Sequence, residues 1–338
     1  MLRLLTVPAR PPILTSMEAI DIAVIYQDHH LLLVNKPAGL VIHPTYKHGN
    51  GTLWDALLAY TQQLGQDDWE PPELPDKPEW AAAPANIQAM LRNKRVERIR
   101  KEEGLLPRPC LLHRLDKDTS GIIALARTER SRWHLIKQFE ERTIVKRYVV
   151  IVRQGSPDWT QPRAPFIVTQ QLAGGHIQLA DASLILTATS DSEFVLDGPL
   201  QRDPDDRRRC IVGPNGKSAI TLVRVLAVER GYALLDVRLL TGRTHQIRAH
   251  LAALGYSIVG DQTYGVPTPE TSAPHLNRQF LHAHSLTLRR YPDNELCTFV
   301  APLASDLWAW LEKTGLASLH KTIHLIAIRA STTLHPDK

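Results

Sequence analysis

Short apolar runs separated by polar turns dominate the pattern of hydrophobic and polar positions along the chain. Continuous apolar runs of roughly 4–8 residues are typical of buried strands, and alternating runs are typical of strands with one exposed face. The first two runs flank a polar Gln-Asp-His-His turn and predict a β-hairpin. The runs that predict strands are residues 22–26, 31–34, 121–126, 147–152, 219–228 and 232–240.

Helical patterns are fewer. Thr52 stands where an N-cap is expected, with Asp55 three residues later, so a helix begins there. Residues 86–103 predict a strongly basic helix. The remaining helical patterns cover residues 129–141, 241–254 (after a turn) and 305–313. Because strands dominate and do not alternate regularly with helices, we predict an α+β fold with a large, mixed, mainly antiparallel sheet.

Composition narrows the class of protein only a little. The 338 residues carry a formal net charge of +5, which permits an acidic partner such as nucleic acid without requiring one. The 3 cysteines are widely spaced and odd in number, so a disulfide framework is not expected and a reducing compartment fits best. No apolar run approaches the ~18 residues of a membrane span, and the start of the chain is unlike a secretory signal. We therefore expect a cytoplasmic protein without a membrane association.

Candidate chemistry lies in one polar segment. Residues His113 to Gly121 read His-Arg-Leu-Asp-Lys-Asp-Thr-Ser-Gly, which places Asp116 between Arg114 and a turn of small residues. Further motif blocks lie at residues 34–44, 146–148, 241–251, 260–265 and 281–283. Together these blocks resemble the RluA family of pseudouridine synthases over roughly residues 22–312. A lone His-Arg-Leu-Asp would be weak evidence, but its order among the other blocks is specific.

The resemblance implies a pseudouridine synthase fold and roles for four residues. Asp116 matches the catalytic nucleophile, and Arg243 matches an arginine that pairs with it and opposes the effect of burial on its charge. Tyr148 matches an active-site tyrosine whose ring can stack on the base and whose hydroxyl can help to remove the C5 proton. Arg114 is implied to fill the space that a flipped uridine leaves in the RNA.

The implied reaction explains these residue types. Uracil is cut from C1′ of its ribose, turned and rejoined through C5, with no net redox change, so neither a cofactor nor a metal is expected. A carboxylate can attack the uracil ring, attack the sugar or act as a base at the sugar, and the sequence leaves these routes open. The expected partner is RNA, with large-subunit rRNA favoured over tRNA by analogy to the Lys117-Asp118 variant of the motif. No obligatory protein partner is evident.

Domain boundaries follow from the matched blocks. We expect an N-terminal extension over residues 1–20, a catalytic domain over 21–315, and a C-terminal tail over 316–338 without a clear role. Met17 is an alternative start, and the small N-terminal S4 domain of many family members is expected to be absent. Stretches near 62–104 and 156–192 exceed the family's usual spacing and are expected to be insertions; the first is rich in proline.

Plainer interpretations exist for each candidate. Asp116 could be a turn acid or helix cap, Arg243 a surface cation, and Tyr148 a core or sheet residue. His245 and His250 lack the spacing of a metal site, so hydrogen-bonding roles are favoured.

The basic run over residues 92–101 is by default a solvated helix face, and the alternative is that Arg95 and Arg98 contact RNA phosphates. Two other classes of protein stay open. One is a non-catalytic RNA-binding protein on the same scaffold, which has no need of Asp116, Tyr148 and Arg243 together. The other is a metal-dependent hydrolase, whose ligand pattern is lacking.

Overall fold

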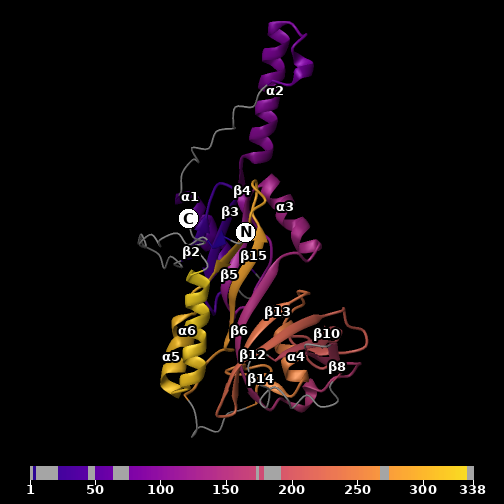
Figure 1. The fold of residues 1–338 in the computed structure, drawn as a ribbon, viewed down its shortest axis with the longest axis vertical. Coiled ribbons are helices and arrows are strands. Elements are labelled where there is room, and N and C mark those ends of the chain that lie inside the picture. The colour runs from indigo at the N-terminus through magenta and orange to yellow at the C-terminus, as the bar shows by residue number, and fades with distance from the viewer. Residues whose placement is uncertain are drawn as a thin grey trace.

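A large mixed β-sheet forms the body of the protein in the computed structural model (Figure 1). The structure describes residues 3–4, 22–44, 50–63, 76–172, 175–178, 192–266 and 274–332. The strands are β1 (Arg3–Leu4), β2 (Ala23–Gln27), β3 (Leu31–Lys36), β4 (Leu105–Leu111), β5 (Ser120–Thr128), β6 (Val145–Gln154), β7 (Ile167–Leu172), β8 (Gly175–Gln178), β9 (Glu193–Asp197), β10 (Leu200–Arg202), β11 (Cys210–Val212), β12 (Ile220–Glu229), β13 (Tyr232–Leu239), β14 (Tyr256–Ile258), β15 (Leu281–Arg289) and β16 (Leu296–Val300).

Fourteen of these strands form one sheet, whose main path runs β2-β3-β5-β15-β6-β13-β12-β9-β7-β8. Strands β10 and β11 form a separate antiparallel pair. Within the sheet the pairs β5–β15 and β1–β16 are parallel, and the other pairs are antiparallel. The predicted hairpin forms from β2 and β3, and the predicted strand pair forms from β12 and β13. The mainly antiparallel sheet expected from the sequence is therefore confirmed.

Strands β5 and β6 carry the site described below and lie inside the sheet. Every residue of β5 is buried, which explains its continuous apolar run, because a strand covered on both faces has no polar side. Strand β12 instead alternates between buried and half-buried residues, as expected for a strand with one face in the core. The hydrophobic core thus runs under the centre of the sheet.

The helices are α1 (Leu53–Gln63), α2 (Ala85–Glu103), α3 (Glu129–Glu140), α4 (Gln246–Ala253), α5 (Ser305–Thr314) and α6 (Ala317–Thr332). Helix α1 begins where predicted: the backbone N–H and the hydroxyl of Thr52 both donate to Oδ2 of Asp55, at 2.9 and 2.8 Å. Helix α3 begins at Thr128, which forms a capping box with Ser131. No helix in the described part of the chain has the length and apolar character that a membrane crossing requires.

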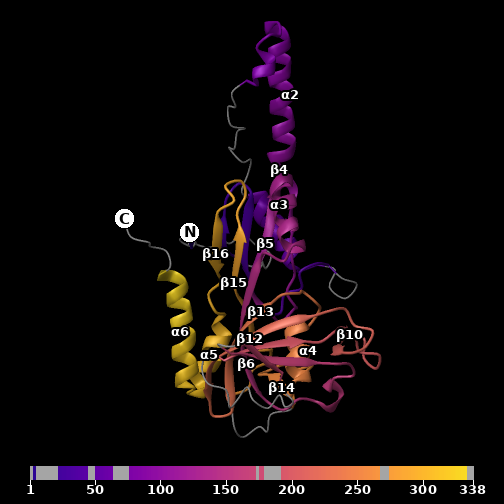
Figure 2. The ribbon, with the colours of Figure 1, turned by 45° about the vertical axis from the view of Figure 1, so that its right-hand side comes forward.

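Helix α2 extends away from the body as an arm (Figures 1 and 2). None of its residues is buried, and Ile87, Met90 and Val96 are exposed along it. Its C-terminal end is tied to the body by Glu102, which pairs with Arg130 of α3. The basic helix predicted over residues 86–103 is confirmed, and it forms most of the described part of the expected insertion.

The C-terminal segment differs from the tail without a clear role that the sequence suggested for residues 316–338. Helix α6 packs against β12, and Leu319 and Ile323 are buried in the core. At least the part of α6 up to Ile323 therefore packs on the folded body, because its apolar side chains cover part of the sheet. In Figure 1, α5 and α6 lie side by side along one edge of the body.

The other expected boundaries fall partly outside the described residues. Of the N-terminal extension, only residues 3–4 are described, and they pair with β16. Within the stretch 156–192, β7 and β8 form a hairpin that continues the sheet beyond β9. The rest of the stretch, from residue 179 to 191, lies outside the described residues.

Candidate active site

Asp116 stands in the turn between β4 and β5. The backbone N–H of Thr119 donates to the carbonyl of Asp116 at 3.1 Å and closes this turn. From the end of β3, the buried side chain of Lys36 reaches the same turn. Its Nζ donates to the backbone carbonyls of Pro37, Leu40 and Lys117, at 2.8, 3.0 and 2.8 Å. These three acceptors match the three hydrogens of an ammonium group, while burial lowers the pKa of Lys36 to about 7.

Gly121 fixes the start of β5 beside this turn. Its φ is +120°, and an added Cβ would lie 2.2 Å from the carbonyl oxygen of Ala283 on β15. Only glycine allows the two strands to approach this closely in that conformation. The small-residue turn of the motif is therefore a packing requirement that holds the Asp116 loop in place.

Arg248 on α4 links Asp116 to a second, buried carboxylate. Its Nη1 donates to Oδ2 of Asp116 at 3.3 Å, and its Nε and Nη2 donate to the two oxygens of Asp261 at 2.6 and 2.8 Å. Burial alone would raise the pKa of Asp261, but the hydrogen bonds and charge of Arg248 hold it below its usual value. In the opposite sense, the two carboxylates outweigh burial and raise the pKa of Arg248. Arg248 thus supplies a fixed positive charge beside Asp116.

His245 lies on the other side of Asp116. Its backbone is left-handed, with φ of +55°, directly before α4. Its Nε2 is 3.9 Å from Oδ2 of Asp116, and its Nδ1 is 3.1 Å from the hydroxyl of Tyr264. Burial lowers the pKa of His245, which favours the neutral ring. Its neighbour His250 is buried, with Nδ1 2.9 Å from the Thr221 hydroxyl, so both histidines make the scaffold contacts that were favoured over metal binding.

Tyr148 comes from β6 and is 6% exposed. Burial raises the pKa of Tyr148, and the charge of Asp116 raises it further, so the phenol stays protonated. Within the described residues, its hydroxyl makes no hydrogen bond to another side chain or to the backbone. The group is therefore open to a ligand in the cavity that it lines.

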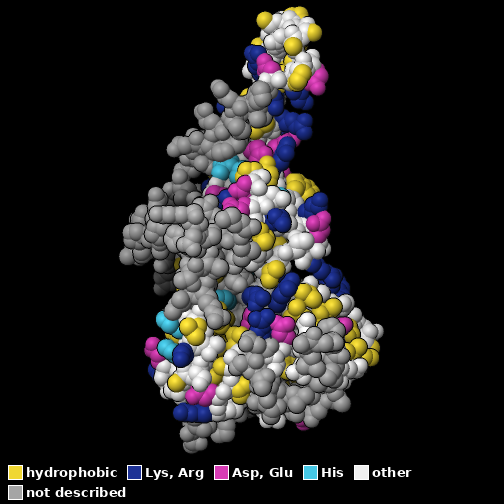
Figure 3. Space-filling model, in the orientation of Figure 1, with side chains coloured by type: hydrophobic (Ala, Val, Ile, Leu, Met, Phe, Trp, Pro, Cys, Tyr) yellow, Lys and Arg dark blue, Asp and Glu magenta, His cyan; other side chains and the backbone are white. Residues whose placement is uncertain are grey.

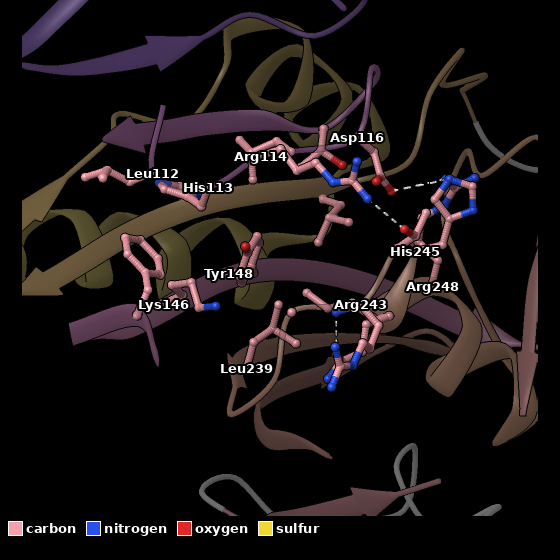
Figure 4. A pocket seen from close by; sticks show the side chains of 18 residues that line it. Leu112, His113, Arg114, Asp116, Lys146, Tyr148, Leu239, Arg243, His245 and Arg248 are labelled. Carbon is pink, nitrogen blue, oxygen red and sulfur yellow. Dashed lines mark hydrogen bonds and ion pairs between the residues drawn. The ribbon is translucent and has the colours of Figure 1, made fainter. Parts of the chain in front are cut away.

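A cavity of about 330 Å³ joins these side chains (Figure 4). Asp116, Tyr148, Arg243 and Arg114 all line it, although they come from three segments far apart in the sequence. Arg114 donates from Nη2 to the hydroxyl of Thr244 at 3.0 Å. The cavity combines a carboxylate, a protonated phenol and several cations, which suits a small polar ring attached to an anionic backbone.

Comparison with known proteins identifies the family to which this geometry belongs. The family model for RNA pseudouridylate synthase matches residues 30–253. The chain belongs to this family. The resemblance predicted from the motif blocks is therefore confirmed, and the matched span contains Asp116, Tyr148, Arg243 and Arg248.

Individual relatives agree with this assignment. The chain is 30% identical over 299 residues to ribosomal large subunit pseudouridine synthase D of Nitrosomonas europaea, covering 87% of this chain and 66% of that protein. It is 36% identical over 273 residues to an uncharacterized RNA pseudouridine synthase of Chloroflexus aurantiacus, covering 81% and 63%. The chain thus spans slightly less than two thirds of the length of these two relatives.

Two solved structures share the fold. Human RNA pseudouridylate synthase domain containing 4 superposes with a TM-score of 0.50 at 21% identity, covering 86% of this chain and 92% of that one. Human RNA pseudouridylate synthase domain containing 1 also gives 0.50, at 18% identity, covering 96% and 100%. The pseudouridine synthase fold expected from the sequence is therefore confirmed.

The partner of Asp116 in this member of the pseudouridylate synthase family differs from the one expected. Arg243 was expected to pair with Asp116, but its Nε donates to the carbonyl of Ser218 at 3.1 Å, and the guanidinium that reaches Asp116 is that of Arg248. Arg243 precedes α4 in the Thr-Gly-Arg-Thr turn and lines the cavity, whereas Arg248 lies in the first turn of the helix. Every residue of α4 is buried, and a buried arginine needs carboxylate partners. This burial, which the sequence does not display, distinguishes Arg248 from Arg243.

Arg95 and Arg98 lie apart from the cavity that Asp116 lines, on the arm α2. Arg98 pairs with Glu102 at 2.9 Å, and the guanidinium of Arg95 lies 5.7 Å from the ring centre of Trp80. Neither residue belongs to the Asp116 cluster. Any contact that they make with RNA is therefore separate from the chemistry.

Proposed function

We propose that this chain isomerises uridine to pseudouridine in RNA, with Asp116 as the nucleophile. The observation that carries this proposal is the position of Asp116 in the cavity, beside the buried cation Arg248 and across from the protonated Tyr148. Oδ2 of Asp116 accepts from Arg248, while Oδ1 has no hydrogen-bond partner among the described residues. One carboxylate oxygen is thus oriented and the other is available for attack.

Charge stabilisation follows from the same contacts. A hydrogen bond from a guanidinium to a carboxylate is charge-assisted and therefore stronger than one between neutral groups. Because Asp261 holds Arg248 through two hydrogen bonds, this cation keeps its place when Asp116 changes charge during the reaction. Arg248 therefore stabilises both the attacking carboxylate and its geometry.

Tyr148 and Arg114 have separate proposed roles. The ring of Tyr148 provides a face on which uracil stacks, and its hydroxyl assists removal of the C5 proton. A uridine in folded RNA must leave its stack to reach this cavity, at a cost of a few kcal/mol. The guanidinium of Arg114, which makes one hydrogen bond to Thr244, fills the space left in the RNA. Arg243 on the opposite wall of the cavity contacts the substrate.

We propose large-subunit rRNA as the substrate, because the names of several relatives refer to the ribosomal large subunit. tRNA is the alternative substrate. Cation density at the surface fits an RNA partner: Figure 3 shows Lys and Arg side chains gathered across the middle of this face of the molecule. The reaction is proposed to need no cofactor or metal. Cys110, Cys210 and Cys297 are all free thiols, which fits action in the reducing cytoplasm.

The arm α2 is proposed as a second RNA contact. Arg98 is exposed, although Glu102 partly neutralises it, and Arg95 is half-buried beside Trp80. Other exposed cations on α2 and just beside these two are Lys94, Arg100 and Lys101, for which no acidic partner is present in the described structure. An RNA lying along the arm would meet these phosphate-binding side chains on the half of the helix next to the body, because residues 85–91 carry no cation.

The catalytic proposal is tested with Asp116→Asn. This change keeps the size of the side chain and removes its charge, so it should abolish isomerisation while RNA binding largely survives. Tritium release from C5-labelled uridine is measured in large-subunit rRNA and tRNA transcripts, alongside a binding isotherm for each. Near-normal turnover by the variant would contradict the role of Asp116, and release from tRNA alone would reassign the substrate.

A further inference from the structure

A second cavity continues the first along the wall formed by β13 and the end of α3. Its volume is about 200 Å³, and it shares Phe139, Lys146, Leu239, Gly242 and Arg243 with the catalytic cavity. Arg142 lines it as well, and its described lining contains no aspartate or glutamate. The two cavities therefore form one groove whose far end carries positive charge only.

Lys146 is the central cation of this groove. It lies on β6 two residues before Tyr148, so the two side chains leave the same face of the strand, and both line the catalytic cavity. Its Nζ lies 5.8 Å from the ring centre of Phe139, and an added Cβ on Gly242 would be 3.6 Å from it. Burial lowers the pKa of Lys146, and no hydrogen bond or ion pair joins its ammonium to another described residue.

Neighbouring cations differ in this respect. Arg147 pairs with Asp236, and Arg248 pairs with Asp261. A partly buried cation is normally paired with an acid, because nonpolar surroundings do not offset the free energy that the charge loses when it leaves water. Lys146 thus carries a desolvated charge that faces a cavity instead of a carboxylate.

Arg243 completes the pair of cations that line both cavities. Its Nε donates to the carbonyl of Ser218, and this hydrogen bond fixes the plane of the guanidinium at the wall of the cavity. In Figure 4, Lys146 and Arg243 lie on either side of Leu239, with Tyr148 close to Lys146. Leu239 therefore separates the two cations, and the second cavity that they share has no acidic residue in its described lining.

A uridine in the catalytic cavity carries a phosphodiester on each side of its ribose, and the strand must leave the cavity through a neighbouring opening. The shared lining makes the second cavity continuous with that opening. We propose that Lys146 and Arg243, with Arg142 at the rim, bind a backbone phosphate next to the target uridine. This inference rests on the proposed function, and it gives the Lys-x-Tyr segment a second task beside that of Tyr148.

The test compares Lys146→Gln with Lys146→Arg in binding a fluorescein-labelled 12-nucleotide oligouridylate. Anisotropy is measured across a range of salt concentrations, and Lys313→Gln on α5 is the matched control, because Lys313 is exposed and lines neither cavity. Loss of one phosphate contact on a single strand should reduce the slope of log affinity against log salt by about 0.7, which corresponds to about 5-fold weaker binding at 0.1 M salt. The Arg variant and the control should keep the slope of the unaltered protein.

Two results would overturn the proposal. Weaker binding by Lys146→Gln with an unchanged slope would mean that Lys146 meets a neutral uracil carbonyl, because no counterion is then released. Unchanged affinity and slope would mean that it contacts no part of the strand. Thermal melting of each variant checks that the fold is intact. Failure of the proposed function is recognised separately, since the unaltered protein would then bind oligouridylate but release no tritium from any RNA.

Discussion

Arg248 offers the sharpest test of how the candidate site is held together. Arg248→Met keeps a long side chain but removes both hydrogen bonds to Asp261 and the contact to Asp116. The side chain of Asp261 is fully buried and would keep only the backbone N–H groups of Thr263 and Tyr264, at 2.8 and 2.9 Å. Removing one member of a buried pair costs about 3–5 kcal/mol. Because two donors remain, we expect a loss of about 3 kcal/mol, or a fall in Tm of roughly 4 °C for a chain of 338 residues.

The pH dependence gives the sign of the effect. In the unaltered protein the pKa of Asp261 is depressed, so its stabilising contribution is present above its unfolded pKa and is lost as the pH falls through the folded pKa. In Arg248→Met, burial acts without the opposing cation and raises the pKa of Asp261. The variant is then less stable at neutral pH, where the buried carboxylate is charged, and it regains stability as the carboxyl gains a proton. The difference in Tm between the two proteins should therefore shrink from pH 7 toward pH 4.

Calorimetry across this pH range measures the effect, and the double variant Arg248→Met, Asp261→Asn provides the control. Removing the stranded charge should restore part of the lost stability at pH 7 and abolish the narrowing at low pH. Tritium release should fall by about 10²-fold or more in both variants, since Asp116 has lost its fixed cation. Equal Tm and an equal pH profile for Arg248→Met and the unaltered protein would refute the view that Arg248 compensates the buried Asp261.

Two further predictions concern the arm and the motif turn. Replacing Arg95 and Arg98 with Gln should reduce the slope of log affinity for folded RNA against log salt by roughly 1–2 units, while turnover in saturating RNA stays unchanged. An unaltered slope would mean that this face of α2 is solvated and binds no phosphate. Gly121→Ala should lower the Tm far more than Gly231→Ala, because both glycines have positive φ but only the former would place its Cβ within 3 Å of another strand. An equal fall in Tm for the two variants would mean that the positive φ alone, and not the contact with β15, sets the loss of stability.

Local patterns predicted much of the fold. The apolar runs of β5, β6, β12 and β13 and the Thr52–Asp55 start of α1 are set by residues within a few positions of one another, so the sequence displays them directly. Strands β14, β15 and β16 were missed, because each is short or mixed in polarity and is defined by its partners in the sheet. Helix α6 was missed for a similar reason: its apolar positions have meaning only against β12.

The site shows the same division. Asp116, Tyr148 and Arg114 could be selected from motif blocks, and the structure places them at one cavity. The choice between Arg243 and Arg248 could not be made from spacing alone, since both lie in one basic block and only the burial of α4 distinguishes them. That Lys146 has no acidic partner among the described residues also depends on segments far away in the sequence, because they line the cavity around it. Motifs therefore indicated which segments meet, while the pairing of charges within the site needed coordinates.

The direction of α2 has a consequence for the RNA contact proposed for it. Its 19 residues span roughly 28 Å, comparable to the overall diameter of a small domain. The arm leads away from the body (Figure 2), and its C-terminal end is tied there by Glu102. Its cations, from Arg92 to Lys101, therefore lie on the half of the arm next to the body, and residues 85–91 carry none. Under the proposal made above, a folded RNA would meet the cavity and this inner half of the arm at two separate places, whatever its base sequence.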